Sequence, residues 1–281
     1  MAPPLVMLAT GLVLLLLSGV YAFTRPDQMA ALNTIKDANT NRSASWVSAL
    51  SSWTCPTDPA DSDGTCDPCS RDWSGNWEHM HCRGAGARYG EGSTGVYDGY
   101  VTTIHVTDQN LEGPPAKEWC LLEKIRELDL DGGHASGPFP DFVLTCLTSL
   151  QELDLSHNRL TGTIPSEISK KTILQEFKME SNFFSGPLPA ALGNMPDLWR
   201  IRLGDNHFTG TVPADWSKLA PTLNQLELER NYLSGNLNAL ADLKLMRVTV
   251  HSNAGLCGMV PASVRYASGY NAAGTRLGQP C

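Results

Sequence analysis

The residues of this sequence best suited to metal chemistry are the thiols and imidazoles between positions 66 and 82. Cys66-x-x-Cys69 is followed by two histidines and by Cys82, and thiolate and imidazole groups are the usual ligands of zinc. The same thiols could instead pair as disulfides, because Cys55 completes an even set of four. The redox compartment of the chain decides between the two chemistries.

The N-terminal segment points to export. Residues 1–22 carry no charged side chain, residues 5–20 are apolar or small, and Ala22 offers a cleavage point, a pattern that predicts a secretory signal peptide. An uncleaved membrane anchor is the alternative, because residues 5–23 approach the roughly 20 apolar residues that cross a bilayer. Export delivers the chain to an oxidising compartment, where cysteines form disulfides. We therefore expect disulfides and no metal site in this cluster.

The four N-terminal cysteines are assigned to two disulfides. Pairing Cys55 with Cys66 and Cys69 with Cys82 is the preferred assignment, although four cysteines allow three connectivities. Asn41-Arg42-Ser43 is a sequon for N-glycosylation, and an unused tripeptide explains it equally well.

The other reactive residues do not form an enzyme-like pattern. The chain lacks the G-x-S-x-G, H-E-x-x-H and P-loop motifs. Nothing predicts a closed pocket that would tune the pKa values of paired carboxylates for acid–base catalysis. The net charge of −8 is dispersed along the chain, which does not favour nucleic acid as a partner. We expect neither an enzyme nor a cofactor.

A repeated element positions the remaining polar residues, and its best copy is the stretch 150–165, L-Q-E-L-D-L-S-H-N-R-L-T-G-T-I-P. The pattern L-x-x-L-x-L-x-x-N-x-L is the signature of a leucine-rich repeat, one coil of a solenoid. It recurs at intervals of 24, 25, 24, 24, 25 and 22 residues, and the positions equivalent to Asn158 are Gln109, Gly133, Asn158, Asn182, Asn206, Asn231 and Asn253. About seven copies predict an α/β solenoid with a short parallel sheet along its concave side.

Asparagine suits the turn after each strand, because a side-chain amide can both donate and accept a hydrogen bond. We expect these amides to pair with backbone groups of adjacent coils that would otherwise stay buried and unsatisfied. Gln109 and Gly133 depart from the pattern, so this ladder should be weakest in the first two coils.

Each asparagine position is followed by a Gly-x-x-Pro-like segment, such as Gly162-Thr163-Ile164-Pro165. Here the chain resembles plant-type leucine-rich repeat proteins, including polygalacturonase-inhibiting proteins and the ectodomains of receptor-like kinases. The resemblance spans residues 27–281, with Trp53, Cys69, Trp73 and Cys82 in the N-terminal cap and N-A-G-L-C-G at 253–258. It implies a right-handed solenoid with a second short sheet at the Gly-x-x-Pro segments.

The predicted organisation has four parts: a signal peptide at 1–22, an N-terminal cap with a Gly/Tyr-rich insertion at 23–100, leucine-rich repeats at 101–253 and a C-terminal cap at 254–281. Helices after Pro26 and around Trp46 should cover the open end of the solenoid.

Two further cysteine pairs follow the cap. Cys120 and Cys146 occupy nearly equivalent slots of successive coils, which lie about 4.7–4.9 Å apart in a sheet. A disulfide needs Cα atoms about 4.4–6.8 Å apart, so we favour a bridge over two buried thiols. Cys257 and Cys281 should tie down the C-terminal tail.

The candidate ligand-binding residues alternate with the core pairs and should point outward from the concave sheet. They are Glu152, Asp154, Glu176, Lys178, Glu180, Arg200, Arg202 and Glu227. Acidic residues dominate the first strands, and Arg200 and Arg202 form a basic spot on the fifth. Such a face could hold a charge-complementary ligand, while the acidic residues could equally serve solubility alone.

The pattern and the resemblance together predict a secreted or cell-surface recognition protein, extracellular in the apoplast or cell wall. The resemblance implies a protein or peptide ligand, with a wall polysaccharide or a wall-degrading enzyme as further candidates. A structural or assembly role in the cell wall or extracellular matrix is the alternative. Membrane contact is expected only through an uncleaved N-terminal segment.

Overall fold

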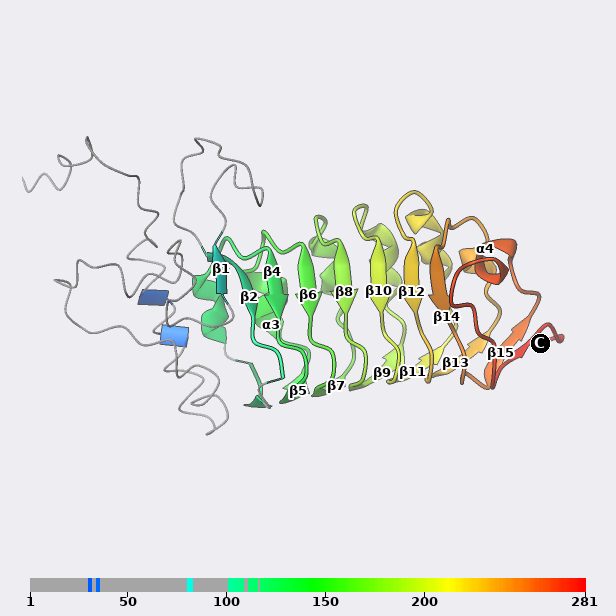
Figure 1. Ribbon diagram of the computed structural model, residues 1–281, viewed down its shortest axis with the longest axis horizontal. Coiled ribbons are helices and arrows are strands. Elements are labelled where there is room, and N and C mark those ends of the chain that lie inside the picture. The colour runs from blue at the N-terminus through cyan, green and yellow to red at the C-terminus, as the bar shows by residue number, and fades with distance from the viewer. Residues whose placement is uncertain (1–29, 32–33, 36–79, 83–100, 109–110, 116) are drawn as a thin grey trace, which may run out of the picture.

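The computed structural model describes residues 30–31, 34–35, 80–82, 101–108, 111–115 and 117–281. Successive coils stack along one axis, and each coil contributes one strand to each of two sheets (Figure 1). The predicted α/β leucine-rich repeat solenoid is therefore confirmed.

The first sheet contains the strands predicted to line the concave side. Its order is β1 (Met80–Cys82), β2 (Val101–His105), β4 (Glu127–Asp129), β6 (Glu152–Asp154), β8 (Glu176–Lys178), β10 (Arg200–Arg202), β12 (Gln225–Glu227) and β14 (Arg247–Thr249). β1 pairs with β2 in the antiparallel direction, and the strands from β2 onward are parallel and in register.

The second sheet forms at the glycine-containing segments, as the resemblance implied. Its strands are β3 (Glu112–Gly113), β5 (His134–Pro138), β7 (Arg159–Gly162), β9 (Phe183–Pro187), β11 (His207–Gly210), β13 (Tyr232–Gly235), β15 (Gly255–Gly258) and β16 (Arg276–Leu277). Glycine is required at Gly186, where φ is +78° and a Cβ atom would lie 2.9 Å from Thr163 Cγ2. The sheet runs along the lower edge of Figure 1.

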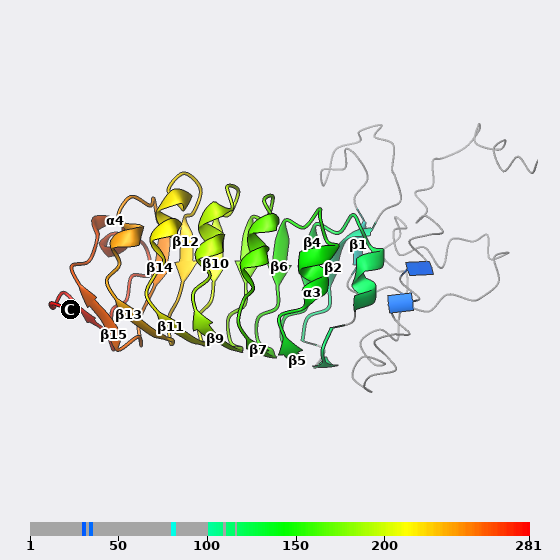
Figure 2. The ribbon, with the colours of Figure 1, turned by 180° about the vertical axis from the view of Figure 1, so that it is seen from behind.

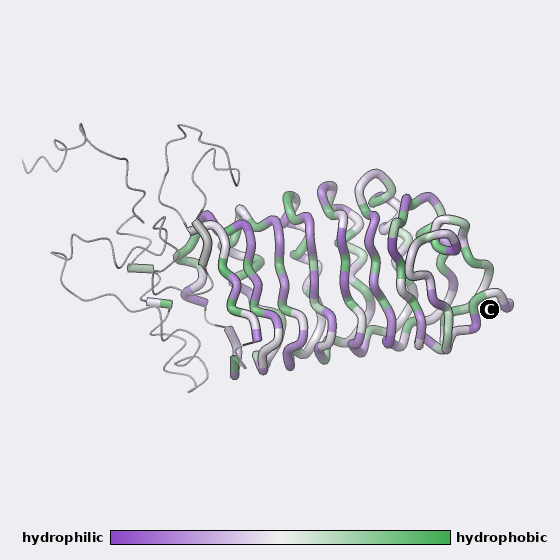
Figure 3. Tube along the Cα trace, viewed as in Figure 1, coloured by the Kyte–Doolittle hydropathy of each residue, from purple (hydrophilic) through white to green (hydrophobic). Residues whose placement is uncertain are grey.

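Short helices cover the side of the solenoid opposite the first sheet (Figure 2). They are η1 (Lys117–Leu121), α3 (Asp141–Thr145), η2 (Ser166–Lys170), η3 (Ala190–Asn194), η4 (Ala214–Leu219), η5 (Asn238–Leu240) and α4 (Ala262–Arg265). Proline precedes several of them, as Pro165 does for η2, because its fixed φ suits the entry to a helix. Hydrophobic residues recur at matching positions in successive coils (Figure 3) and form one continuous core.

The asparagine ladder is confirmed in the coils that carry it. Asn158 Nδ2 donates to the carbonyl oxygen of Leu130 in the preceding coil at 2.7 Å, and Asn158 Oδ1 accepts from the Ala135 amide at 2.9 Å. The same two contacts recur at Asn182, Asn206, Asn231 and Asn253. At Gly133 a Cβ atom would lie 2.8 Å from Asn158 Oδ1, so the missing side chain leaves room for the next amide. Gln109 lies outside the described residues.

Both predicted disulfides of the repeat and C-terminal regions are present. Cys120 and Cys146 are bridged with Cα atoms 5.2 Å apart, and Cys257 and Cys281 are bridged with Cα atoms 5.1 Å apart. Within the N-terminal cap, Ala31 and Ile35 lie in helical segments and are buried in the core, as expected for a helix that covers the first coil.

Several predictions fall outside the described residues or side chains. These are the signal peptide at 1–22, the sequon at Asn41 and the pairing of Cys55, Cys66, Cys69 and Cys82. The domain boundaries also stay predictions. Across the part of the chain that is described, no helix combines the length and apolar character needed to span a membrane.

Candidate functional site

The outer face of the first sheet brings the predicted ligand-binding residues together. Strand alternation points every second side chain outward, and the in-register pairing aligns these side chains in columns across the coils. The first column is Thr103, Glu127, Glu152, Glu176, Arg200, Gln225 and Arg247; the second is His105, Asp129, Asp154, Lys178, Arg202, Glu227 and Thr249. Asp131, Ser156, Glu180, Gly204 and Glu229 occupy a third position just beyond the strands.

Opposite charges alternate around Glu176 in the C-terminal half of this face, from β8 to β14. The Glu176 carboxylate lies 2.9 Å from Lys178 Nζ and 2.8 Å from Arg200 Nη1, and its side chain is only 8% exposed. Lys178 also lies 3.6 Å from Asp154. Burial acts to lower the pKa of Lys178, and the hydrogen bond to Glu176 and the surrounding carboxylates outweigh it, so the pKa is raised.

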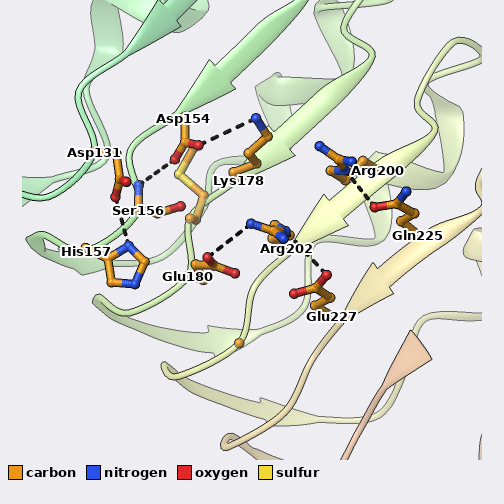
Figure 4. A network of polar contacts seen from close by, with 12 residues as sticks. Asp131, Asp154, Ser156, His157, Lys178, Glu180, Arg200, Arg202, Gln225 and Glu227 are labelled. Atoms are coloured by element: carbon orange, nitrogen blue, oxygen red, sulfur yellow. Dashed lines mark hydrogen bonds and ion pairs between the residues drawn. The ribbon is translucent and has the colours of Figure 1, made fainter. Parts of the chain in front are cut away.

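A second centre of ion pairing is Glu227, whose side chain is 5% exposed. Its carboxylate lies 3.4 Å from Arg202 Nε and 3.0 Å from Arg247 Nε. Arg202 also reaches Glu180 at 3.3 Å, so one guanidinium joins carboxylates from two neighbouring coils (Figure 4).

Arg200 is held on three sides. Besides Glu176, it donates from Nε to Gln225 Oε1 at 2.8 Å (Figure 4), and its guanidinium carbon lies 4.4 Å from the centre of the Trp199 ring. An arginine over an aromatic face gains a cation–π contact. Its position is therefore fixed before any partner arrives.

The N-terminal half of the face, from β2 to β6, has a different charge pattern. It contains the carboxylates of Glu127, Asp129, Asp131, Glu152 and Asp154, with no lysine or arginine in the same columns. Its carboxylates contact two histidines and one lysine: His105 lies 3.6 Å from Glu127, His157 Nδ1 lies 2.8 Å from Asp131 Oδ1, and Lys178 of the neighbouring coil lies 3.6 Å from Asp154. Within the described residues, no ion pair involves Asp129 or Glu152.

The titration behaviour of this half follows from its geometry. Burial, with the nearby Asp154 charge adding to it, raises the pKa of Asp129 to about 6, although the Asp131 amide donates to its carboxylate. Burial and the charges of Glu176 and Glu127 raise the pKa of Glu152. The Glu127 carboxylate raises the pKa of His105. In the C-terminal half, burial also raises the pKa of Glu180, against the lowering effect of Arg202.

All eight predicted residues lie on or beside this one face. They differ in burial and in ion pairing, which the sequence did not reveal. Glu176 and Glu227 are buried between cations, and the predicted basic spot of Arg200 and Arg202 is bound to carboxylates on both sides. Sequence reasoning also missed the Trp199 contact, although its place immediately before Arg200 is a usable signal. The described residues contain no group of three histidine, cysteine or acidic side chains arranged to hold a metal ion.

Comparison with known proteins agrees with this architecture. A family model described as Leucine Rich Repeat matches residues 149–170. The crystal structure of a TDR receptor is 29% identical with a TM-score of 0.54, covering 59% of this chain and 29% of that chain. A pollen receptor kinase 3 structure is also 29% identical, with a TM-score of 0.57 over 68% of this chain and 84% of that chain. The PEPR1–AtPEP1 structure shares the fold alone, at 20% identity and a TM-score of 0.57.

The chain thus has the leucine-rich repeat fold, and it resembles structures described as a TDR receptor and a pollen receptor kinase. It spans about a third or less of several of the structures it matches, including 29% of the TDR receptor and 30% of PEPR1. No curated protein sequence is significantly similar to it.

Proposed function

We propose that this chain is an extracellular recognition module that binds a protein or peptide ligand through the outer face of its first sheet. The observation that carries the proposal is the ordered array of charged side chains on that face, half-buried and held by contacts across coils. Polar side chains that are already ordered in the free protein lose little conformational entropy on binding. They therefore favour a ligand whose charge pattern matches theirs. The likeness to two proteins described as receptors supports the same role.

The two halves of the face suggest how a ligand would lie. Lysine or arginine side chains of the ligand would meet the carboxylates of Asp129 and Glu152, which have no cation of their own. The C-terminal half would contribute shape and hydrogen bonds, because its charges are already paired with each other. A peptide or an exposed protein segment matches this arrangement, and a wall-degrading enzyme is one protein that could present it.

The remaining parts of the proposal concern the context of binding. We infer secretion through cleavage after Ala22, glycosylation at Asn41, and membrane attachment only if the N-terminal segment stays uncleaved. The role is binding, not catalysis, since the charged groups lie on an open sheet.

The test is unbiased capture of partners from extracellular fluid with the exported protein as bait. The informative variant is Glu152→Gln/Asp154→Asn, because it changes charge on the face while keeping side-chain size. Glu167→Gln/Asp197→Asn is the matched control, since both residues are exposed and lie outside the sheet. Loss of the captured partner with the first pair and retention with the second is expected. Equal recovery with all proteins would overturn the proposal. Retention in the insoluble wall fraction without a stoichiometric partner would instead favour the structural or assembly role.

A further inference from the structure

A column of exposed aromatic rings lies on the second sheet, away from the charged face. Phe183 of β9 stacks on His207 of β11 with ring centroids 5.9 Å apart, and His207 stacks on Tyr232 of β13 at 5.8 Å. Phe183 is 51% exposed and Tyr232 is 65% exposed. The core of the second sheet does not need these rings, because Phe184, Phe208 and Leu233 point inward beside them and are fully buried.

A hydroxyl group accompanies each ring. The strands are paired so that Thr161 lies beside Phe183, Ser185 beside His207, and Thr209 beside Tyr232. The hydroxyls of Thr161 and Ser185 donate to glycine carbonyls of the preceding coil at 3.3 and 3.4 Å. Their donor proton is used in this way, so the oxygen atoms remain available to accept hydrogen bonds.

The same face is poor in charge. β9, β11 and β13 read FFSGP, HFTG and YLSG and contain no aspartate, glutamate, lysine or arginine. Along β9, β11 and β13 a strongly charged partner, such as an acidic polymer or an anionic lipid surface, therefore meets no counter-charge. Beside them, β7 supplies Thr161 and carries exposed Arg159 at the position equivalent to Phe183. Each of the three coils that contain β9, β11 and β13 offers an apolar ring and a hydrogen-bond acceptor.

From this pattern we propose that Phe183, His207 and Tyr232, with the hydroxyls of Thr161, Ser185 and Thr209, bind a neutral glycan chain. A pyranose ring presents C–H groups that pack on aromatic carbon, and hydroxyl protons that seek acceptors. A polymer of such units would meet a ring and oxygen pair at each of these three coils. This site is separate from the charged face and does not depend on the function proposed for it.

The experiment is affinity electrophoresis of the exported protein in gels that contain hydroxyethyl cellulose, xyloglucan or galactomannan, with polygalacturonate as the acidic comparison. Phe183→Ala/Tyr232→Ala should weaken retardation by the neutral polysaccharide ~tenfold, because both outer rings of the column are lost. Met246→Ala/Met259→Ala removes two other strongly exposed apolar side chains and should leave retardation unchanged. Thr161→Val/Thr209→Val keeps side-chain shape, removes the acceptors and should weaken retardation ~threefold.

Each alternative outcome contradicts the proposal. Wild-type protein that is retarded by none of the three neutral polysaccharides would overturn it, as would equal retardation of the wild type and the ring variant. Self-association of the wild type that the ring variant abolishes, measured by sedimentation, would assign the column to contact between copies instead. Thermal unfolding of each variant within a few degrees of the wild type verifies that the fold is retained.

Discussion

The two halves of the first sheet share one backbone and differ in how their charges are satisfied. From β8 to β14 the face mixes Glu176, Glu180 and Glu227 with Lys178, Arg200, Arg202 and Arg247, and these groups form ion pairs within and between coils. From β2 to β6 carboxylate follows carboxylate, as in Asp129 beside Asp154. In the C-terminal half, lysine and arginine side chains therefore compensate the carboxylate charges. In the N-terminal half, most carboxylates would need protons or a cationic partner to compensate their charge.

The cause is the register of parallel strands. Equivalent positions in neighbouring coils lie about 4.8 Å apart, so unlike charges in one column attract and like charges repel. A carboxylate should thus stabilise the fold in the C-terminal half, where it pairs with cations, and destabilise it in the N-terminal half, where its neighbours are carboxylates.

The largest effect is expected at Glu227. Glu227→Gln leaves Arg202 and Arg247 without their shared, buried carboxylate, and removal of one member of a buried pair is strongly destabilising. The arginines keep access to water, which moderates the loss, and we expect about 2 kcal/mol in the free energy of unfolding. Urea denaturation measures it. A loss below the error of the method would show that the C-terminal pairs do not support the fold.

The opposite sign is expected at Asp129. Asp129→Asn removes a carboxylate that burial and Asp154 disfavour, while its Oδ1 atom can still accept from the Asp131 amide. After allowance for solvent screening, we expect a gain of about 1 kcal/mol at pH 7.5. Glu167→Gln is the control, because it removes an equal charge from an exposed position. Destabilisation by Asp129→Asn would contradict the account.

The dependence of stability on pH should also distinguish the halves. Asp129 has a pKa of about 6 in the fold, above its ordinary value of 3.8, and a raised pKa gives stability that is present at low pH and lost as pH rises through about 6. The raised pKa values of Glu152 and His105 act in the same direction, as does that of Glu180 in the C-terminal half. Wild-type stability should therefore increase by about 1 kcal/mol from pH 7.5 to pH 5. In Asp129→Asn the profile should flatten, and an unaltered slope would exclude Asp129 as its source.

The smallest effect is expected at Trp199. Trp199→Leu keeps an apolar side chain and removes the cation–π contact with Arg200, which is worth about 0.5–1 kcal/mol at an exposed site. Arg200 retains Glu176 and Gln225, so a loss well above that range would mean that Trp199 has a further structural role.

Sequence periodicity predicted the solenoid because the same pattern of apolar, asparagine and glycine positions recurs in successive repeats. The pair Leu153 and Leu155, the amide of Asn158 and the glycine of Gly162 each recur at equivalent positions, and one error in one coil does not change the register of the others. The bridge between Cys120 and Cys146 could be predicted for the same reason, since their slots fix their separation.

The site was less predictable because its properties depend on neighbours across coils. Sequence alternation placed Arg200 and Arg202 on the outer face, yet it could not show that each arginine pairs with a buried glutamate, Glu176 or Glu227. Likewise, Asp129 and Asp154 read as ordinary surface acids, whereas burial of Asp129 on the sheet, with Asp154 beside it in the same column, raises the pKa of Asp129. The ring column from Phe183 to Tyr232 was missed because each aromatic residue appears once in its own repeat.

The most direct test of the contrast between the halves is a carboxyl ¹³C NMR titration of the exported protein, with assignments from the Asp129→Asn and Glu152→Gln variants. Asp129 should titrate near pH 6, and the Glu152 midpoint should lie above its ordinary value of 4.5. Midpoints near 4 for both residues would contradict the account, because the N-terminal half would then carry its charges without penalty.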